Sequence, residues 1–399
     1  MKTTSFPVIP YGRQNISEKD IHAVLEVLHS DYLTQGPKVP EFEKKMTAFC
    51  GASHAVAVNS ATSALHLACL ALGLGPGDTL WTSPITFVAS ANCALYCGAS
   101  VDFVDIDPKT WNLCPIKLEE KLHQAEKQNR LPKIVVPVHL CGQPCDMEAI
   151  HRLSLKYGFS IIEDAAHATG ASCKKETVGN CRYSDITIFS FHPVKIITTA
   201  EGGMAMTNQK DLAEKMALLR SHGITRDENA MTQPPDGPWY YQQIDLGFNY
   251  RMTEIQAALG ISQMDRLQEF IKKRQQLSQR YSQLLKDLPL TLPFCLPDYD
   301  SAWHLYIIRL QKNQISKSHR EIFEALRTEG IGVNLHYIPV HTQPYYRAMG
   351  FREGQFPEAE NYYKEAISLP LFPDLQEADQ NRVIDALNRV LGMGQTHKT

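Results

Sequence analysis

Short apolar runs that alternate with helix-like segments constrain the fold of this chain more than any other feature of its sequence. The runs are rich in aliphatic and β-branched residues and cover residues 54–58, 79–82, 101–106, 133–140, 160–163 and 186–191. Helix-like segments such as residues 64–74 separate them. Strands that alternate with helices form mainly parallel sheets that helices cover. The pattern therefore predicts an α/β fold with a mainly parallel sheet.

The length of the chain predicts a second, smaller domain. A chain of 399 residues is longer than one hydrophobic core usually serves. Thr253 with Gln256 three residues later is typical of a helix start, and the apolar spacing after it predicts one long helix that ends before Pro289. We place the boundary along this helix, and expect a large domain over residues 1–255 and a small α+β domain over residues 256–399.

The composition argues against a nucleic-acid or membrane partner. A formal charge of -3 and a pI near 6.6 supply no basic field. The N-terminus has no apolar export segment, and the longest apolar stretch, residues 64–74, is shorter than the ~20 residues that a membrane span needs. The ten cysteines include no Cys-x-x-Cys pair. We therefore expect reduced thiols, no metal site and a cytoplasmic protein.

Lys195 is the first candidate for chemistry. It follows the apolar run 186–191 and precedes Glu201-Gly202-Gly203, and sheets of this kind bind ligands beyond the carboxyl ends of their strands. A single lysine at a turn is most often only an exposed side chain. A lysine that is partly desolvated at a sheet edge loses its proton more easily, and the neutral amine forms Schiff bases. Lys195 in this setting points to pyridoxal phosphate.

Pyridoxal phosphate makes further demands, and residues that follow other predicted strands could meet them. Asp164 could keep the pyridine nitrogen protonated, although an acidic helix cap is about as common at such a turn. Residues 60–63 precede a helix and could hold the phosphate, with Ser190 adding a hydroxyl. Phe87 could lie against the ring, although such an aromatic is more often core. His167 could contact the ring or its O3′.

Six ordered motifs then carry a resemblance to a known family: NSATSALHLA, PITFVASAN, EDAAHATGA, SFHPVK with TTAEGGM, DLGFNYRMTEIQAALG and GIGVNLHYIPVH. Together they resemble the sugar aminotransferases of the DegT/DnrJ/EryC1/StrS family over residues 9–375. The resemblance implies the type I pyridoxal-phosphate fold, similar to aspartate aminotransferase, with a large domain and a small C-terminal one. It also implies a homodimer whose active sites lie at the subunit interface.

The same resemblance assigns roles to single residues. Lys195 matches the Schiff-base lysine, Asp164 the partner of the pyridine nitrogen, and Phe87 the residue that stacks on the ring. The phosphate contacts match Thr62, Ser63, Ser190 and Asn249, the last through the neighbouring subunit. The candidates for substrate contacts are Arg251, His336 and Tyr337. Arg251 is the candidate for the donor carboxylate, and a structural salt bridge is the alternative.

Within the family, the motifs look most like the pseudaminic-acid branch. That branch implies transfer of the amine of L-glutamate to C4 of a UDP-linked 4-keto-6-deoxy-N-acetylhexosamine, giving UDP-4-amino-4,6-dideoxy-N-acetyl-β-L-altrosamine. Two departures bear on the sugar pocket: Ile196 stands where proline is frequent, and residues 227–238, which are predicted to form a loop, look longer than usual.

Three alternatives stay open at this point. One is a nucleotide-sugar aminotransferase that acts on another sugar or at C3. Another is a pyridoxal-phosphate-dependent sugar dehydratase of the same family, in which histidine replaces the lysine. The most remote is a sugar-nucleotide-binding regulator without catalysis.

Overall fold

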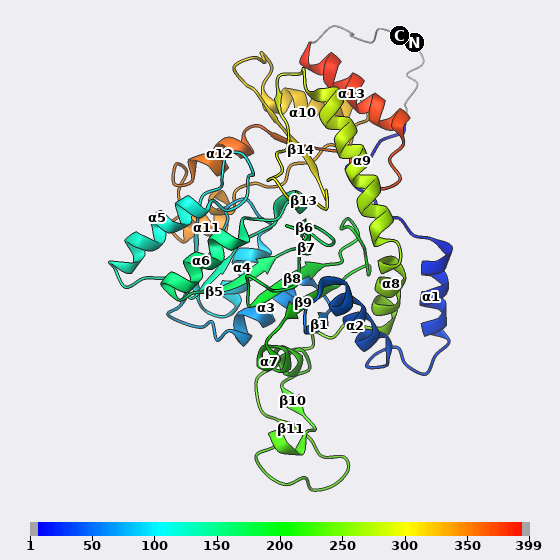
Figure 1. Cartoon of the computed structure of the whole chain (residues 1–399), viewed down its shortest axis with the longest axis vertical. Coiled ribbons are helices and arrows are strands. Elements are labelled where there is room, and N and C mark those ends of the chain that lie inside the picture. The colour runs from blue at the N-terminus through cyan, green and yellow to red at the C-terminus, as the bar shows by residue number, and fades with distance from the viewer. Residues whose placement is uncertain (1–6, 393–399) are drawn as a thin grey trace.

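This computed structural model describes residues 7–392 of the chain. A sheet of seven strands lies at the centre of the structure (Figure 1). Its strand order is β1-β9-β8-β5-β4-β2-β3. The strands are β1 (His54–Val58), β2 (Thr79–Thr82), β3 (Ser100–Phe103), β4 (Ile134–Val136), β5 (Ser160–Asp164), β8 (Ile186–Ser190) and β9 (Gly203–Thr207). Only β9 runs antiparallel to its neighbours, β1 and β8. The predicted mainly parallel sheet and its six strands are confirmed, while β9 was not predicted.

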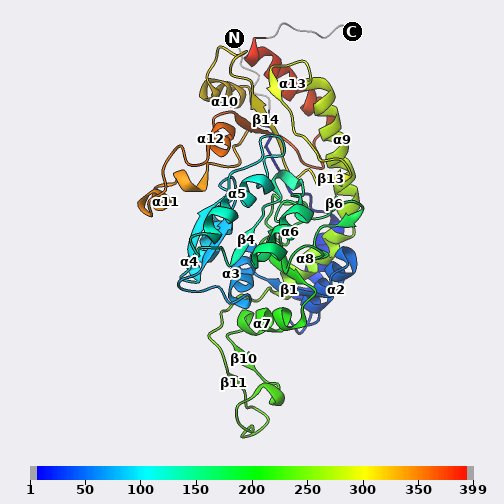
Figure 2. The same cartoon turned by 60° about the vertical axis from the view of Figure 1, so that its left-hand side comes forward.

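Helices cover both faces of the sheet (Figures 1 and 2). One face packs against α3 (Ala61–Ala71), α4 (Ala89–Tyr96) and α7 (Lys210–Arg220). The other face packs against α2 (Lys38–Cys50), α5 (Pro115–Glu126), α6 (Met147–Tyr157) and α8 (Glu254–Met264). Side chains of β1 alternate between the two layers, since Val56 and Val58 join the first cluster and Ala57 joins the second.

The C-terminal part of the chain builds a second core. It contains an antiparallel sheet of β12 (Leu290–Thr291), β14 (Tyr306–Leu310) and β15 (Ala366–Leu369), and the helices α9 (Leu267–Leu285), α10 (His319–Thr328) and α13 (Glu377–Leu391). The expected single helix from Thr253 is two helices, α8 and α9, with Asp265 and Arg266 between them. Residues 1–6 and 393–399 of the two expected domains lie outside the described residues.

Part of the C-terminal region returns to the large sheet. After β14, the chain forms α11 (Pro344–Ala348) and α12 (Pro357–Tyr363), which lie beside α4 and α5 in Figure 2. Tyr346 and Phe356 pack edge-to-face on Phe103 at the end of β3. The core of the large sheet therefore includes side chains from both regions of the sequence.

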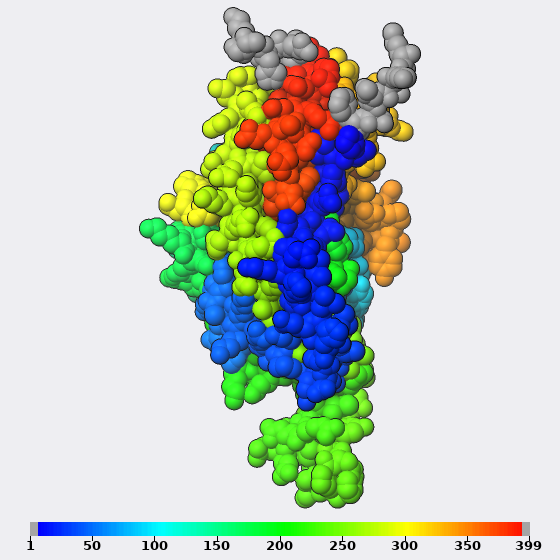
Figure 3. Space-filling model, turned by 90° about the vertical axis from the view of Figure 1, so that its right-hand side faces the viewer, coloured from blue at the N-terminus to red at the C-terminus, as the bar shows by residue number. Residues whose placement is uncertain are grey.

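Two segments reach out from the sheet layers. The N-terminal helix α1 (Glu18–Leu28), capped by Ser17, packs against α8, and the chain before it runs over the surface beside α13 (Figure 3). The predicted loop over residues 227–238 is confirmed, and the short strands β10 (Ile224–Thr225) and β11 (Gln242–Gln243) close its base. The resulting arm, residues 224–243, projects beyond α7 (Figure 1).

A small three-stranded sheet is the remaining sheet of the described residues. It joins β6 (Ser172–Cys173), β7 (Glu176–Thr177) and β13 (Tyr299–Asp300). None of the helices in residues 7–392 combines the length and apolarity that crossing a bilayer requires.

Candidate active site

A cavity of about 470 Å³ lies at the carboxyl ends of β5 and β8. This is the edge at which mainly parallel sheets bind their ligands. The predicted site residues that line it are Thr62, Phe87, Asp164, His167, Ser190, Lys195, His336 and Tyr337. They come from the ends of three strands, the start of α3 and the segment before α11, so the fold gathers residues that are far apart in the sequence.

Lys195 enters this cavity from the turn after β8. The backbone N–H of Lys195 donates to the carbonyl of His192 at 2.9 Å, which closes the turn. Burial lowers the pKa of Lys195 to about 8, and the negative charge of Asp164 opposes that shift. A larger fraction of this amine is therefore neutral near pH 7 than for an exposed lysine, and neutral amines are nucleophiles.

Asp164 is held in a fixed orientation at the end of β5. Ser90 Oγ donates to its Oδ2 at 2.6 Å, and the backbone N–H of Ala166 donates to its Oδ1 at 3.0 Å. Thr86 Oγ1 lies 2.7 Å from Ser90 Oγ and extends this hydrogen-bond network. The next residue along the chain, Phe87, is 58% exposed. A carboxylate fixed in this way can bind a protonated ring nitrogen without reorganising.

The start of α3 offers backbone amides to the same cavity. Ser60 is the N-cap, and its Oγ accepts the N–H of Ser63 at 3.1 Å. The first bond to the Ser60 carbonyl comes from Ala64, so the amides of Ala61 and Thr62 have no partner within the helix. Both residues line the cavity, as does Ser190. Free amides and hydroxyls at a helix N-terminus are a suitable site for a phosphate.

His167 and Tyr337 form a hydrogen-bonded pair in the wall of the cavity. The backbone N–H of Cys141 donates to His167 Nδ1 at 3.2 Å, so the proton of the neutral ring is on Nε2, which lies 3.1 Å from Tyr337 Oη. Burial and the charges of Lys195 and His336 keep the pKa of His167 well below its ordinary value. Burial likewise raises the pKa of Tyr337. Both groups are neutral hydrogen-bonding groups near pH 7.

His336 lines the cavity beside Tyr337. Its Nδ1 lies 2.8 Å from Ser368 Oγ, and Tyr11 packs on its ring at 5.4 Å between centroids. Burial, together with the charge of Lys195, lowers the pKa of His336 to about 4. This imidazole is therefore uncharged near neutral pH.

Three predicted site residues lie outside this cavity. The Ser63 hydroxyl donates to Asn59 Oδ1 at 2.7 Å, within the turn before α3. Asn249 is exposed and pairs with Ser221 through its backbone, and Arg251 pairs with Val58 at the end of β1. Neither Asn249 nor Arg251 is among the lining residues of the described chain.

The structure also brings residues to the cavity that the sequence did not single out as site residues, among them Tyr11 and His304. Tyr11 is held there because its carbonyl accepts the N–H of Leu371 at 3.0 Å. His304 lies two residues before the start of β14, and its ring lies 4.4 Å from that of His167. The sequence around each of these two residues shows only an aromatic or histidine side chain beside a turn or strand, and nothing else there indicates a site residue.

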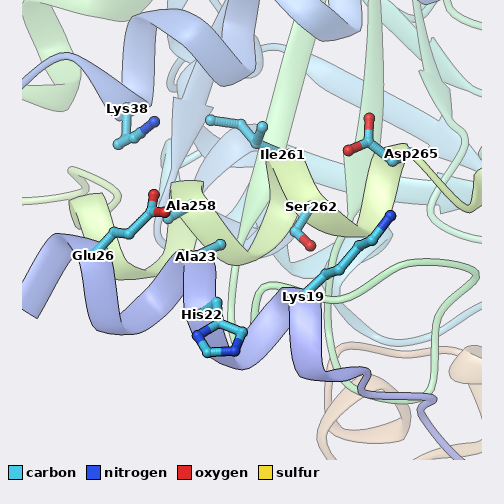
Figure 4. Close-up of a pocket in the computed structure, with 9 residues that line it drawn as sticks. All are labelled: Lys19, His22, Ala23, Glu26, Lys38, Ala258, Ile261, Ser262 and Asp265. Carbon is cyan, nitrogen blue, oxygen red and sulfur yellow. The ribbon is translucent and has the colours of Figure 1, made fainter.

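A second hollow, of about 350 Å³, lies between α1 and α8 (Figure 4). Its lining residues are Lys19, His22, Ala23, Glu26, Lys38, Ala258, Ile261, Ser262 and Asp265. It contains none of the predicted site residues, and its two lysines are balanced by two carboxylates. Nothing in this hollow therefore competes with the cavity around Lys195 as the site of the predicted chemistry.

The residues of this cavity fit pyridoxal phosphate. An amine of lowered pKa, a carboxylate held by two hydrogen bonds, an exposed phenyl ring and a helix N-terminus with free amides surround one space. These groups match the aldehyde, the pyridine nitrogen, the ring face and the phosphate of that cofactor.

Comparisons with known proteins agree with this fit. Residues 14–388 match the DegT/DnrJ/EryC1/StrS aminotransferase family. The spore coat polysaccharide biosynthesis protein SpsC of Bacillus subtilis (strain 168) is 41% identical over 387 residues, which cover 96% of this chain and 97% of that protein.

Solved structures of similar proteins cover almost the whole chain. PseC of Helicobacter pylori, an aminotransferase involved in the biosynthesis of pseudoaminic acid, superposes with a TM-score of 0.88 at 31% identity over 96% of this chain and 99% of that one. Spr1654 of Streptococcus pneumoniae, solved in a PLP-form, has a TM-score of 0.86 at 28% identity over 98% of this chain and 100% of that one. The fold is that of a type I pyridoxal-phosphate-dependent transferase. The chain belongs to the DegT/DnrJ/EryC1/StrS aminotransferase family and is a sugar aminotransferase that uses pyridoxal phosphate.

Proposed function

We propose that this enzyme transfers the amine of L-glutamate to C4 of a UDP-linked 4-keto-6-deoxy-N-acetylhexosamine. The product would be UDP-4-amino-4,6-dideoxy-N-acetyl-β-L-altrosamine. The observation that best supports transamination is that Lys195 and Asp164 line the same cavity. The choice of sugar is supported by the similarity to PseC and by the motifs that resemble the pseudaminic-acid branch.

Lys195 would hold the cofactor covalently and move the proton. When bound, pyridoxal phosphate supplies an aldehyde that takes up the amine and a ring that accepts the electron pair of the substrate carbon. The neutral Nζ of Lys195 would take the proton from the donor carbon as a general base and, once protonated, would deliver it to the cofactor as a general acid. The lowered pKa of Lys195, about 8, supports both roles near neutral pH.

Other side chains would orient the reacting groups. Asp164 holds the proton on the pyridine nitrogen, and Phe87 fixes the plane of the ring. Thr62 and Ser190 bind the phosphate together with the first amides of α3, while His167 donates from Nε2. Ser63, whose hydroxyl donates to Asn59, supports the turn that presents these amides. We assign His336 and Tyr337 to the substrate, in keeping with their position in the cavity wall.

The enzyme would work as a homodimer whose subunits share their active sites. Asn249 is exposed and outside the cavity of its own subunit, which supports a role at the phosphate bound by the partner. The arm and the chain after it expose large apolar side chains, with Trp239 72% and Leu246 75% exposed, and such surfaces are often covered by another protein chain. Arg251 stays a candidate for substrate binding across this interface.

Two further parts of the proposal concern the whole chain. We retain the division into a large and a small domain at residues 255 and 256, and the separate C-terminal core supports the existence of the second domain. We also retain a cytoplasmic location, because the ten cysteines are all free thiols, as is usual in a reducing compartment.

The visible absorption spectrum of the purified enzyme tests the reaction. L-Glutamate should bleach the cofactor band near the visible edge, and a UDP-linked 4-keto-6-deoxy-N-acetylhexosamine of one C5 configuration should restore it. Recovery with a different nucleotide sugar would assign the enzyme to another sugar, which is the main alternative. A band that glutamate leaves unchanged would remove the donor assignment, and Lys195→Ala should abolish the response without unfolding the protein.

A further inference from the structure

His304 is a buried histidine of the cavity, and one of its ring nitrogens has no partner among the described residues. It is 3% exposed, and its Nδ1 makes no hydrogen bond within residues 7–392 although it is fully buried. Native proteins satisfy nearly all buried polar side-chain atoms, so an unpaired nitrogen beside a cavity suggests a missing ligand. His304 is also a lining residue of that cavity, next to the ring of His167.

The backbone around His304 is held rigidly. The amide of Ala302 donates to the Gly142 carbonyl at 3.1 Å, and that of Leu305 donates to the Cys141 carbonyl at 3.3 Å. Gly142 has φ +97°, and a Cβ there would lie within 2.9 Å of Trp303 N. The position of the His304 ring is therefore set by the close packing of the backbone around it and not by a hydrogen bond of its Nδ1.

A positive charge without a counter-ion lies behind His304. Arg274 is 1% exposed, and its Nη1 donates to the carbonyls of Trp303, His304 and Leu371 at 3.2, 3.1 and 3.0 Å. No carboxylate pairs with it among residues 7–392. Arg274, Lys195 and Arg13 line the same small void of about 10 Å³, and Lys195 also lines the cavity, so three basic groups gather beside it. A buried cation without a counter-ion favours the binding of an anion nearby.

The cavity needs such an anion site. The proposed donor, L-glutamate, brings carboxylates, yet no arginine lines the cavity in the described chain. Burial, followed by the neighbouring bases His167, Lys195, Arg274 and His336, keeps the pKa of His304 well below its ordinary value. Of these groups, Lys195 and Arg274 carry positive charge near neutral pH, and that charge would stabilise a carboxylate placed against the ring of His304.

We propose that His304, backed by the uncompensated charge of Arg274, binds a carboxylate of the amino donor. This inference rests on the proposed function, because it takes L-glutamate as the donor. His304 donates one ring N–H to the carboxylate, and Arg274 contributes through its field without direct contact. His304 is thus a donor-specificity residue, and the sugar nucleotide binds independently of it.

Two titrations test this assignment. The first measures the L-glutamate concentration that half-bleaches the visible band of the cofactor-loaded enzyme. The second measures by calorimetry the affinity for glutarate, a dicarboxylate without an amine that cannot react. His304→Phe should weaken both by about tenfold or more, as expected for the loss of a hydrogen bond to a charged group. His304→Asn should keep part of the affinity, because its amide nitrogen lies near the position of Nδ1.

A matched control separates this effect from lost packing. His341 is also a buried histidine with an unpaired Nδ1, and it lies outside the cavity, bonded to Glu360 at 3.0 Å. His341→Phe should leave both titrations unchanged. Unchanged glutarate affinity in His304→Phe, or a loss confined to the UDP-sugar, would overturn the inference. If glutamate fails to bleach the wild-type band, the proposed function fails, while the glutarate titration still decides the role of His304.

Discussion

At the scale of single residues, the carboxylate of Asp164 is the group on which the rate should depend most after Lys195. Its two hydrogen bonds, from Ser90 and Ala166, fix its orientation in the cavity. Asp164→Asn keeps the shape and removes the charge that would hold the pyridine proton. We expect the turnover rate to fall on the order of a hundredfold or more, as for the loss of one preorganised electrostatic contact.

The neighbouring Glu163 provides the control for that substitution. It lies on the same strand but bonds His139 at 2.8 Å in the buried layer behind the sheet, away from the cavity. Glu163→Gln should lower the melting temperature, since it breaks a buried pair, and should leave the turnover rate of folded protein within a few-fold. Similar rates for Asp164→Asn and wild type would contradict the assigned role of Asp164.

The pKa of Lys195 gives a second prediction for a single residue. With a pKa of about 8, about a tenth of the amine is neutral at pH 7. The rate at which cofactor-free enzyme attaches added pyridoxal phosphate should therefore rise with pH and level off above about pH 8. Stopped-flow recording of the visible band from pH 6 to 10 measures this rate.

The charge of Asp164 makes that pH profile specific. Because Asp164 raises the pKa of Lys195, removing its charge should lower that pKa. In Asp164→Asn the plateau should begin at a lower pH than in the wild type. A rate that keeps rising to pH 10 in both proteins would mean that Lys195 titrates as an exposed lysine.

At the scale of elements, the contact between β9 and the start of α3 should control cofactor affinity. A Cβ added at Gly203 would lie within 2.6 Å of the Cα of Ala61, in the turn whose amides face the cavity. Gly203→Ala must move that turn, at a cost of about 1–3 kcal/mol. We expect cofactor affinity to fall roughly tenfold, measured by titrating cofactor-free protein. Gly75→Ala, which meets nothing within 4 Å, should bind the cofactor normally.

The sequence predicted those parts of the site that are encoded locally. Asp164 ends one strand and the 60–63 turn lies just beyond another, so the hydrophobic pattern and the predicted parallel direction of the strands were enough to place them at one sheet edge. The strand β9, Gly-Met-Ala-Met-Thr, was missed because glycine and alanine weaken the strand signal. Its place between β1 and β8 is set by tertiary pairing.

Tyr11 and His304 could not be predicted as site residues because long-range packing brings them to the cavity. Tyr11 is held by Leu371, and His304 is held through Gly142 and Arg274. The break between α8 and α9 could not be predicted either, because the helical spacing of apolar residues continues through Asp265 and Arg266. The roles assigned to the site residues stay predictions until variants are measured.

At the scale of the whole molecule, Asn249 is a residue that the motifs assign to the phosphate but that lies outside the cavity of the described chain. Asn249 lies on the exposed segment that follows the arm, and it pairs with Ser221 rather than with any residue of the cavity. If Asn249 completes the site of a second subunit, two inactive variants can complement each other. Lys195→Ala removes the amine, and Asn249→Asp places a negative charge against the phosphate.

Co-expression of these two variants with different affinity tags isolates the mixed dimer by tandem purification. One of its two sites then combines the intact Lys195 of one subunit with the intact Asn249 of the other, so about half of the wild-type activity should return. If Asn249 served its own subunit, neither site would be intact and the mixed dimer would be inactive. The matched control pairs a Lys195→Ala subunit with a subunit that carries both Lys195→Ala and Asn249→Asp. Both sites of this dimer lack the Lys195 amine, so it should be inactive. Failure to recover any protein carrying both tags would instead show that the subunits do not form a stable dimer.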